Sequence, residues 1–187
     1  MGIVEDAREF ALSEIKEFGT PIVVHFELSE REAKKLLKEF EVDEEVVLAG
    51  VYLMDVKLGQ AIKEGRPQDH VQMSVDATEE FLDKSDLEEE KRKKILNCVG
   101  AHHGTIPFEC KEAEICANAD CYRFIHPRGV FAYFTLLGKR SSDPDDCISQ
   151  AEKKLEEKWN ILSLNSCKQE LEPYYKSFKQ FFEDARK

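Results

Sequence analysis

The side chains best suited to chemistry in this sequence are its histidines and two aspartates that fall within apolar segments. The chain has five histidines, and two of them, His102 and His103, are adjacent. The candidate metal-binding side chains are His25, Asp55, His70, His102, His103 and Asp120. Imidazole nitrogens and carboxylate oxygens together suit divalent ions such as Zn, Mn, Fe, Ni, Co or Mg. These residue types therefore predict a divalent metal ion, whose identity the sequence leaves open.

The two aspartates give the main reason to expect an ion. Asp55 is the only charged residue in the apolar run VVLAGVYLMDV, and Asp120 lies within ICANADCYRF. An ionised carboxylate in apolar surroundings costs several kcal/mol unless a cation pairs with it. A metal ion would satisfy both aspartates and could take imidazole ligands from neighbouring helices. Alternatively, each aspartate is a buried cap or a member of an ion pair.

Helices must position these residues, because apolar side chains recur at three- and four-residue spacing along almost the whole chain. No segment alternates as a half-buried strand over a useful length, so the pattern predicts an all-α fold. We expect helices up to Gly19, from Thr20-Pro21 to about Phe40, from Asp43 through the apolar run, over about 70–83, from Ser85 or Asp86 to His102-His103, over about 110–125, over 130–137, from Pro144 to about Leu162, and from Pro173 onward. Ser29 with Glu32 is a competing start signal, so a break near residue 28 stays open.

Length and charge narrow the classes of function. A chain of 187 residues fits a single domain. Lys plus Arg number 27 against 38 for Asp plus Glu, a formal net charge of −11. Such a field repels the phosphates of DNA and RNA, so we expect no nucleic acid polymer as a partner. A small phosphorylated ligand remains compatible, because a bound cation can invert the local sign.

The remaining composition predicts where the protein works. The acidic, amphipathic start lacks the features of a signal peptide, and no run approaches the roughly 20 apolar residues that span a bilayer. We therefore expect a soluble, cytoplasmic protein that does not enter the membrane. The six cysteines form no C-x-x-C pair, and we expect reduced and mostly buried thiols.

The order of these motifs resembles the HD superfamily of metal-dependent phosphohydrolases. The resemblance rests on His25, the apolar run ending in Asp55, His70, the pair His102-His103, and NADCYRF with Asp120. It covers about residues 20–135 and implies an HD-like helical bundle. The helices of residues 1–19 are an addition to that core, and so is a C-terminal helical extension over about 144–187. Neither carries a motif that can be assigned.

The resemblance implies a role for each candidate. The first metal would be held by His25, Asp55 and Asp120, and His70 and His102, with His103 as an alternate, would bind a second metal or the phosphate. The implied catalytic set is Asp55, Lys57, His70 and His102. Asp55 would orient or deprotonate the attacking water. Lys57, Arg66 and Arg128 are cationic candidates for contacting the phosphate of the substrate.

One position departs from the family pattern. The histidine that precedes the motif aspartate is replaced by Met54, whose thioether is a poor ligand for hard divalent ions. The first site is then either vestigial or rebuilt from His25, Asp55, Asp120 and one histidine of 102–103. We expect a hydrolase acting on a nucleotide or other small phosphate ester. The alternative is a degenerate HD-like module that binds a ligand or a protein without catalysis, and a homodimer is left open.

Overall fold

The computed structural model describes residues 2–187, and this part of the chain is entirely helical, with no strand. The all-α prediction is therefore confirmed. In chain order the helices are α1 (Ile3–Phe18), α2 (Val23–Leu36), α3 (Glu44–Leu53), α4 (Leu58–Lys63), the 3-10 helix η1 (Pro67–Asp69), α5 (His70–Leu82), α6 (Glu89–Ala101), α7 (Lys111–Ile125), α8 (Pro127–Leu137), α9 (Pro144–Ile161) and α10 (Asn165–Asp184).

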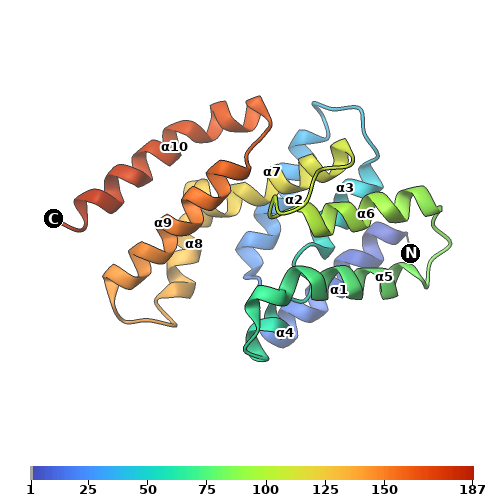
Figure 1. Ribbon diagram of the computed structural model, residues 1–187, viewed down its shortest axis with the longest axis horizontal. Helices are drawn as coiled ribbons and strands as arrows, with labels where there is room; N and C mark the ends of the chain where they lie inside the picture. The colour runs from blue at the N-terminus through green and yellow to red at the C-terminus, as the bar shows by residue number, and fades with distance from the viewer. Residues whose placement is uncertain (1) are drawn as a thin grey trace.

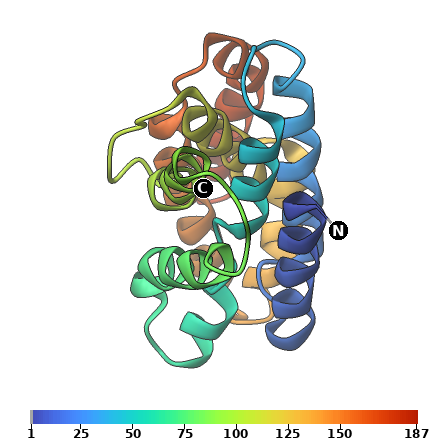
Figure 2. The same cartoon turned by 90° about the vertical axis from the view of Figure 1, so that its right-hand side faces the viewer.

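Helix α7 forms the centre of the molecule. It packs against three helices that precede it in the sequence, α2, α3 and α6, and against the three that follow it, α8, α9 and α10. Figure 1 shows α9 and α10 at one end of the molecule and α1, α4 and α5 toward the other, and Figure 2 shows the same helices from the side. Because α7 contacts helices that precede it and helices that follow it in the chain, a residue on α7 can meet side chains from both. Asp120 lies on α7 and is buried.

The apolar run folds as the buried helix that its composition predicts. Asp43 caps α3 through its side chain, which accepts hydrogen bonds from the amides of Glu45 and Val46. All side chains from Val46 to Leu53 are buried. Gly50 permits the close approach of α6, since a Cβ there would lie 2.5 Å from the Cβ of Cys98. This tight packing fixes the end of α3, where Asp55 follows.

The C-terminal extension is a pair of adjacent helices. Asp143 caps α9 and Pro144 occupies its first turn, as the sequence predicts. The rings of Trp159 and Tyr175 stack with centroids 4.3 Å apart and join α9 to α10. The turn between the two helices is held by α7, because the amide oxygen of Asn118 accepts hydrogen bonds from the backbone of residues 163 and 164, each 3.1 Å long.

Three expectations about element boundaries need correction. The last helix begins at Asn165 and continues through Pro173, which is an exposed interior position of the helix and not its start. Helix α6 begins at Glu89 rather than near residue 86, without a side-chain cap. Helix α2 begins at Val23 and ends at Leu36, instead of running from Thr20-Pro21 to about Phe40, and it is continuous through residue 28.

Two further expectations concern the cysteines and membrane-spanning helices. None of the six cysteines forms a disulfide, and all are buried except Cys110, which is half-buried. Burial raises the pKa of the Cys98 thiol well above its ordinary value. Within residues 2–187, no helix combines the length and the apolar character that crossing a bilayer requires.

Candidate metal centre

Four of the predicted metal-binding side chains converge on one point. Asp55, His70, His102 and His103 each offer a ligand atom, and these atoms all lie within 4.8 Å of one another. They come from three places in the fold: the turn after α3, the start of α5, and the end of α6. The packing of α3 and α5 against α6 brings these three places together. The result is a partly buried His/Asp cluster that could hold a metal ion.

The distances within this cluster are short. Asp55 Oδ1 lies 3.4 Å from His70 Nε2 and 3.4 Å from His102 Nε2. The Nε2 atoms of His70 and His103 are 3.3 Å apart. His102 is completely buried, whereas His70 and His103 are half-buried. The cluster therefore has a closed side at His102 and an accessible side at His70 and His103.

The other ring nitrogen of each histidine in the cluster is held by an acceptor. The Nδ1–H groups of His70 and His102 donate to the carbonyl oxygens of Pro67 and Val99, each at 2.7 Å. The Nδ1–H group of His103 donates to Glu157 Oε1 at 3.1 Å. A carbonyl cannot donate, so the proton of a neutral ring must lie on Nδ1 and the lone pair on Nε2. This is the arrangement that orients histidines which bind metals.

Burial keeps the rings of His70 and His103 neutral near pH 7. Burial lowers the pKa of His103 to about 4, against the raising effect of the Glu157 carboxylate. Burial also lowers the pKa of His70, despite the nearby Asp55. Hydrogen bonds from His103 and Lys154 outweigh burial and lower the pKa of Glu157 to about 2, so its carboxylate is ionised and can only accept. Lone pairs of neutral rings that face each other across 3.3 Å repel unless a cation lies between them.

Two atoms of the cluster are buried without a hydrogen-bond partner. Within residues 2–187, neither Asp55 Oδ1 nor His102 Nε2 accepts a hydrogen bond, although both are shielded from solvent. A buried acceptor without a partner costs about 1–3 kcal/mol, and such atoms in a folded protein call for an ion or a water. These two atoms lie within 4.8 Å of the ligand atoms of His70 and His103, so all four could bind one ion. The donor set thus fits a divalent ion on the evidence of its own unsatisfied atoms.

Asp120 belongs to an ion-pair chain beside the cluster. Arg123 Nη1 donates to Asp55 Oδ2 at 2.5 Å and to Asp120 Oδ1 at 2.8 Å. Lys158 Nζ lies 2.6 Å from Asp120 Oδ2. Burial alone would raise the pKa of both carboxyls, but neighbouring cations hold both well below their ordinary value: Arg123 acts on Asp55, and Lys158 and Arg123 act on Asp120. Both carboxylates therefore remain ionised.

His25 also has other partners than the cluster. Its Nε2–H group donates to the backbone carbonyl of Gly129 at 2.9 Å, and its ring lies against Phe124 and Tyr133. Burial, followed by the charge of Arg123, lowers the pKa of His25 to about 4. The structure thus brings four of the six predicted metal ligands together and places His25 and Asp120 outside that group.

A cavity opens beside the cluster. It encloses about 220 Å³, and Asp55, His70 and His103 line it together with His25 and Asp120. Its apolar wall is formed by Ile22, Leu58, Ile62, Phe124, Tyr133 and Leu136. Its cationic side chains are Arg123, Arg140, Lys154 and Lys158. A small molecule with an anionic group and an apolar part would meet complementary surfaces here.

The three predicted phosphate-contacting cations lie elsewhere. Lys57 pairs with Glu14 at 2.9 Å on another part of the surface. Arg66 pairs with Glu64 at 2.7 Å, and Arg128 is exposed. None of the three lines the cavity next to the cluster. Met54, the departure from the family pattern, is buried within the hydrophobic core and does not line the cavity either.

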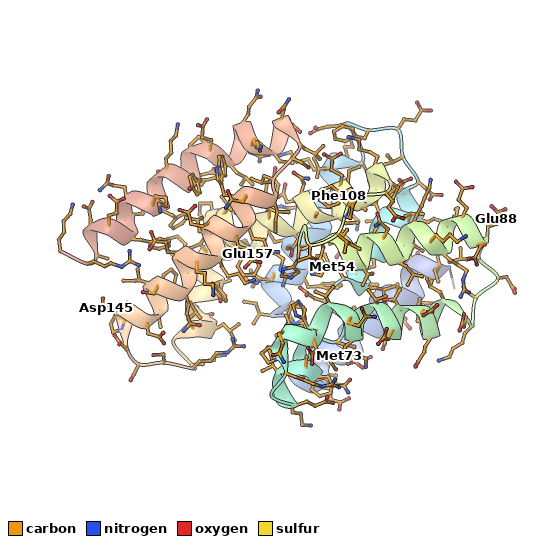
Figure 3. The ribbon with its side chains drawn as sticks, viewed as in Figure 1. Met54, Met73, Glu88, Phe108, Asp145 and Glu157 are labelled. Carbon is orange, nitrogen blue, oxygen red and sulfur yellow. The ribbon has the colours of Figure 1, made fainter. Side chains whose placement is uncertain are left out.

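Sequence reasoning missed three residues that complete the site: Arg123, Glu157 and Lys158. Glu157 lies on α9 in the middle of the molecule, as Figure 3 shows, and receives the hydrogen bond from His103. A signal for Lys158 was present, because it follows the buried Leu155 by three residues and so falls on the inward-facing stripe of α9. A charge in that stripe indicates a buried counter-ion.

The comparisons with known proteins add no family to this geometry. The chain matches no protein-family model, no curated protein and no solved structure.

Proposed function

We propose that this protein is a metal-dependent phosphohydrolase, acting on a small phosphate ester such as a nucleotide. Asp55, His70, His102 and His103 would hold one divalent cation. The observation that supports this most directly is the convergence of unprotonated Nε2 atoms on Asp55 Oδ1, with each histidine fixed from behind at Nδ1. When bound, the cation would supply Lewis-acid activation of water and of a phosphoryl oxygen.

The protein's own groups would prepare the reaction in several ways. Arg123 fixes Asp55 through Oδ2 and leaves Oδ1 directed at the histidines. Arg140 and Lys154 line the cavity and would attract the phosphate of the substrate. The apolar wall would receive the organic part of the ester and exclude water from it. The cavity volume of about 220 Å³ favours a small substrate over a polymer.

A module that binds a metal or ligand without turnover is the second candidate. The feature that favours it is the buried thioether of Met54, since a chain that has given up one ligand of a catalytic pattern can retain the scaffold. The two candidates differ in one measurable respect. The enzyme hydrolyses phosphate esters with a bound metal, and the module binds the metal without hydrolysing them.

The test measures metal content and hydrolysis on the same protein. The protein is purified without chelator, its metals are measured by mass spectrometry, and hydrolysis of an aryl phosphate is followed after stripping and adding back Mn, Fe, Co, Ni, Zn or Mg. We expect His102→Ala and Asp55→Asn to lose the bound metal and to lower the rate by about 100-fold or more, since each removes a ligand.

His126→Asn is the matched control, because His126 lies outside the cluster and asparagine retains the capping acceptor of α8. It should keep both the metal and the activity. Bound metal without hydrolysis of any phosphate ester would favour the binding module. No bound metal with any of the ions would overturn the metal-dependent hydrolase and also a module that binds a metal.

A further inference from the structure

Both oxygens of the Asp120 carboxylate lie beside a positively charged side chain of the protein itself. Its Oδ1 accepts a hydrogen bond from Arg123, and its Oδ2 lies 2.6 Å from the ammonium group of Lys158. The contact with Lys158 is an ion pair by distance, without the geometry of a hydrogen bond. The exposed fractions of Asp120, Arg123 and Lys158 are 1%, 3% and 1%. At such burial the surrounding solvent screens these charges less than it screens surface ion pairs, so each charge acts more strongly on its neighbours.

The charges in this group balance. Asp55 and Asp120 contribute two negative charges, and Arg123 and Lys158 contribute two positive charges. The Lys158 ammonium stays protonated: burial lowers its pKa, but Asp120 together with Cys121 and Glu157 raises it by more. A second divalent cation at Asp120 would have to displace Lys158 or lie against two buried positive groups. Both alternatives are costly, since an expelled ion would leave an uncompensated buried charge.

We propose that Arg123 and Lys158 take the place of a second metal ion, so that the protein binds a single divalent cation per chain, at Asp55, His70, His102 and His103. This inference rests on the proposed metal centre and specifies its stoichiometry. Asp120 is then a positioning residue, which holds Arg123 against Asp55 and does not touch the metal. The permanent charge of the two side chains is available whether or not an ion is bound.

Helix α9 is the element that makes this arrangement possible. Two consecutive residues of α9 reach the site: Glu157 accepts the hydrogen bond from His103, and Lys158 neutralises Asp120. The same helix thus supports one metal ligand and fills the neighbouring cation position. The C-terminal extension is in this way a functional part of the site.

The test counts the ions. Stripped full-length protein is titrated with Mn²⁺ and with Co²⁺ by calorimetry, and the bound metal is measured after gel filtration. We expect one ion per chain for the unmodified protein. We also expect one ion for the charge-balanced double variant Asp120→Asn with Lys158→Met, with a Kd within about threefold of the unmodified value, because no metal ligand has been removed.

Lys158→Met alone removes the positive charge beside Asp120 Oδ2, so this variant should bind a second ion with lower affinity. Two ions in the unmodified protein, or loss of an ion in the double variant, would overturn the inference. An unchanged count in a folded Lys158→Met protein would overturn it as well. If that variant fails to fold, the double variant still decides the question. Absence of any bound ion would refute the proposed function itself, which distinguishes the two failures.

Discussion

The side chain of Met54 lies outside the site, although Asp55, the next residue, belongs to it. The sequence marked position 54 because a ligand was expected there, and the structure places the Met54 side chain in the hydrophobic core. Asp55, the next residue, faces the histidines. The turn after α3 therefore directs adjacent side chains to different surroundings, and the cluster is built without position 54.

The replacement Met54→His tests this reading of position 54. A histidine there would bury a polar ring among apolar neighbours, which costs about 2 kcal/mol. We expect a lower free energy of unfolding in urea and an unchanged number of bound metal ions. Met54→Leu is the control and should be nearly neutral for both quantities. A rise in metal affinity with histidine would show that this side chain reaches the ion after all.

At the scale of the element, α9 explains why the C-terminal helices belong to the site. Glu157 holds the Nδ1–H group of His103, and its neighbour Glu156 faces Tyr175 and Lys179 on the opposite contact with α10. These two adjacent carboxylates thus serve different purposes. One orients a histidine, and the other joins two helices.

Replacement of Glu157 with alanine should weaken metal binding by about 10–100-fold, the usual effect of losing the group that orients a histidine ligand. Glu156→Ala is a matched control on the same helix, and it should leave the affinity for Mn²⁺ unchanged. Titration of both stripped variants by calorimetry gives the comparison. Equal affinities in the two variants would contradict the role of Glu157.

Local signals predicted the helices but not their pairing. Capping at Asp43 and the Asp143-Pro144 start are encoded within a few residues and were read correctly. Pro173 misled because proline is favoured at the first position of a helix and disfavoured in the interior, whereas here it lies inside α10. The Arg123–Asp55 contact joins residues 68 positions apart and depends on how α7 packs, so no local pattern encodes it. The charge requirement at Asp55 and Asp120 was evident, whereas the cations that meet it were not.

At the scale of the whole molecule, the buried histidines make stability depend on pH. Burial lowers the pKa of His25 and His103 to about 4, below the value of about 6.5 for an unfolded chain. The unfolded state then binds more protons than the folded state as the pH falls below about 6.5. The stability is complete above that pH and is lost progressively toward pH 4. The carboxyls of Asp55 and Asp120, whose pKa values are lowered, remain charged in this window and do not contribute.

For His25 the expected loss between about pH 7.5 and about pH 5 is about 2 kcal/mol, from the difference between its two pKa values. Urea unfolding of metal-stripped protein at both pH values measures the total loss. His25→Gln keeps a donor for the Gly129 carbonyl but cannot be protonated, so its loss should be smaller by about that amount. His126 provides the comparison, because it is half-buried in a turn and His126→Asn should retain nearly the full pH dependence.

If His25→Gln lost as much stability as the unmodified protein, His25 would have to be protonated in the folded state already, and its contact with Gly129 could not be the one made by a neutral ring. The acid sensitivity would then come from His70 and His103, whose pKa values burial also lowers, and bound Mn²⁺ would reduce it by competing with protons for the same nitrogen atoms.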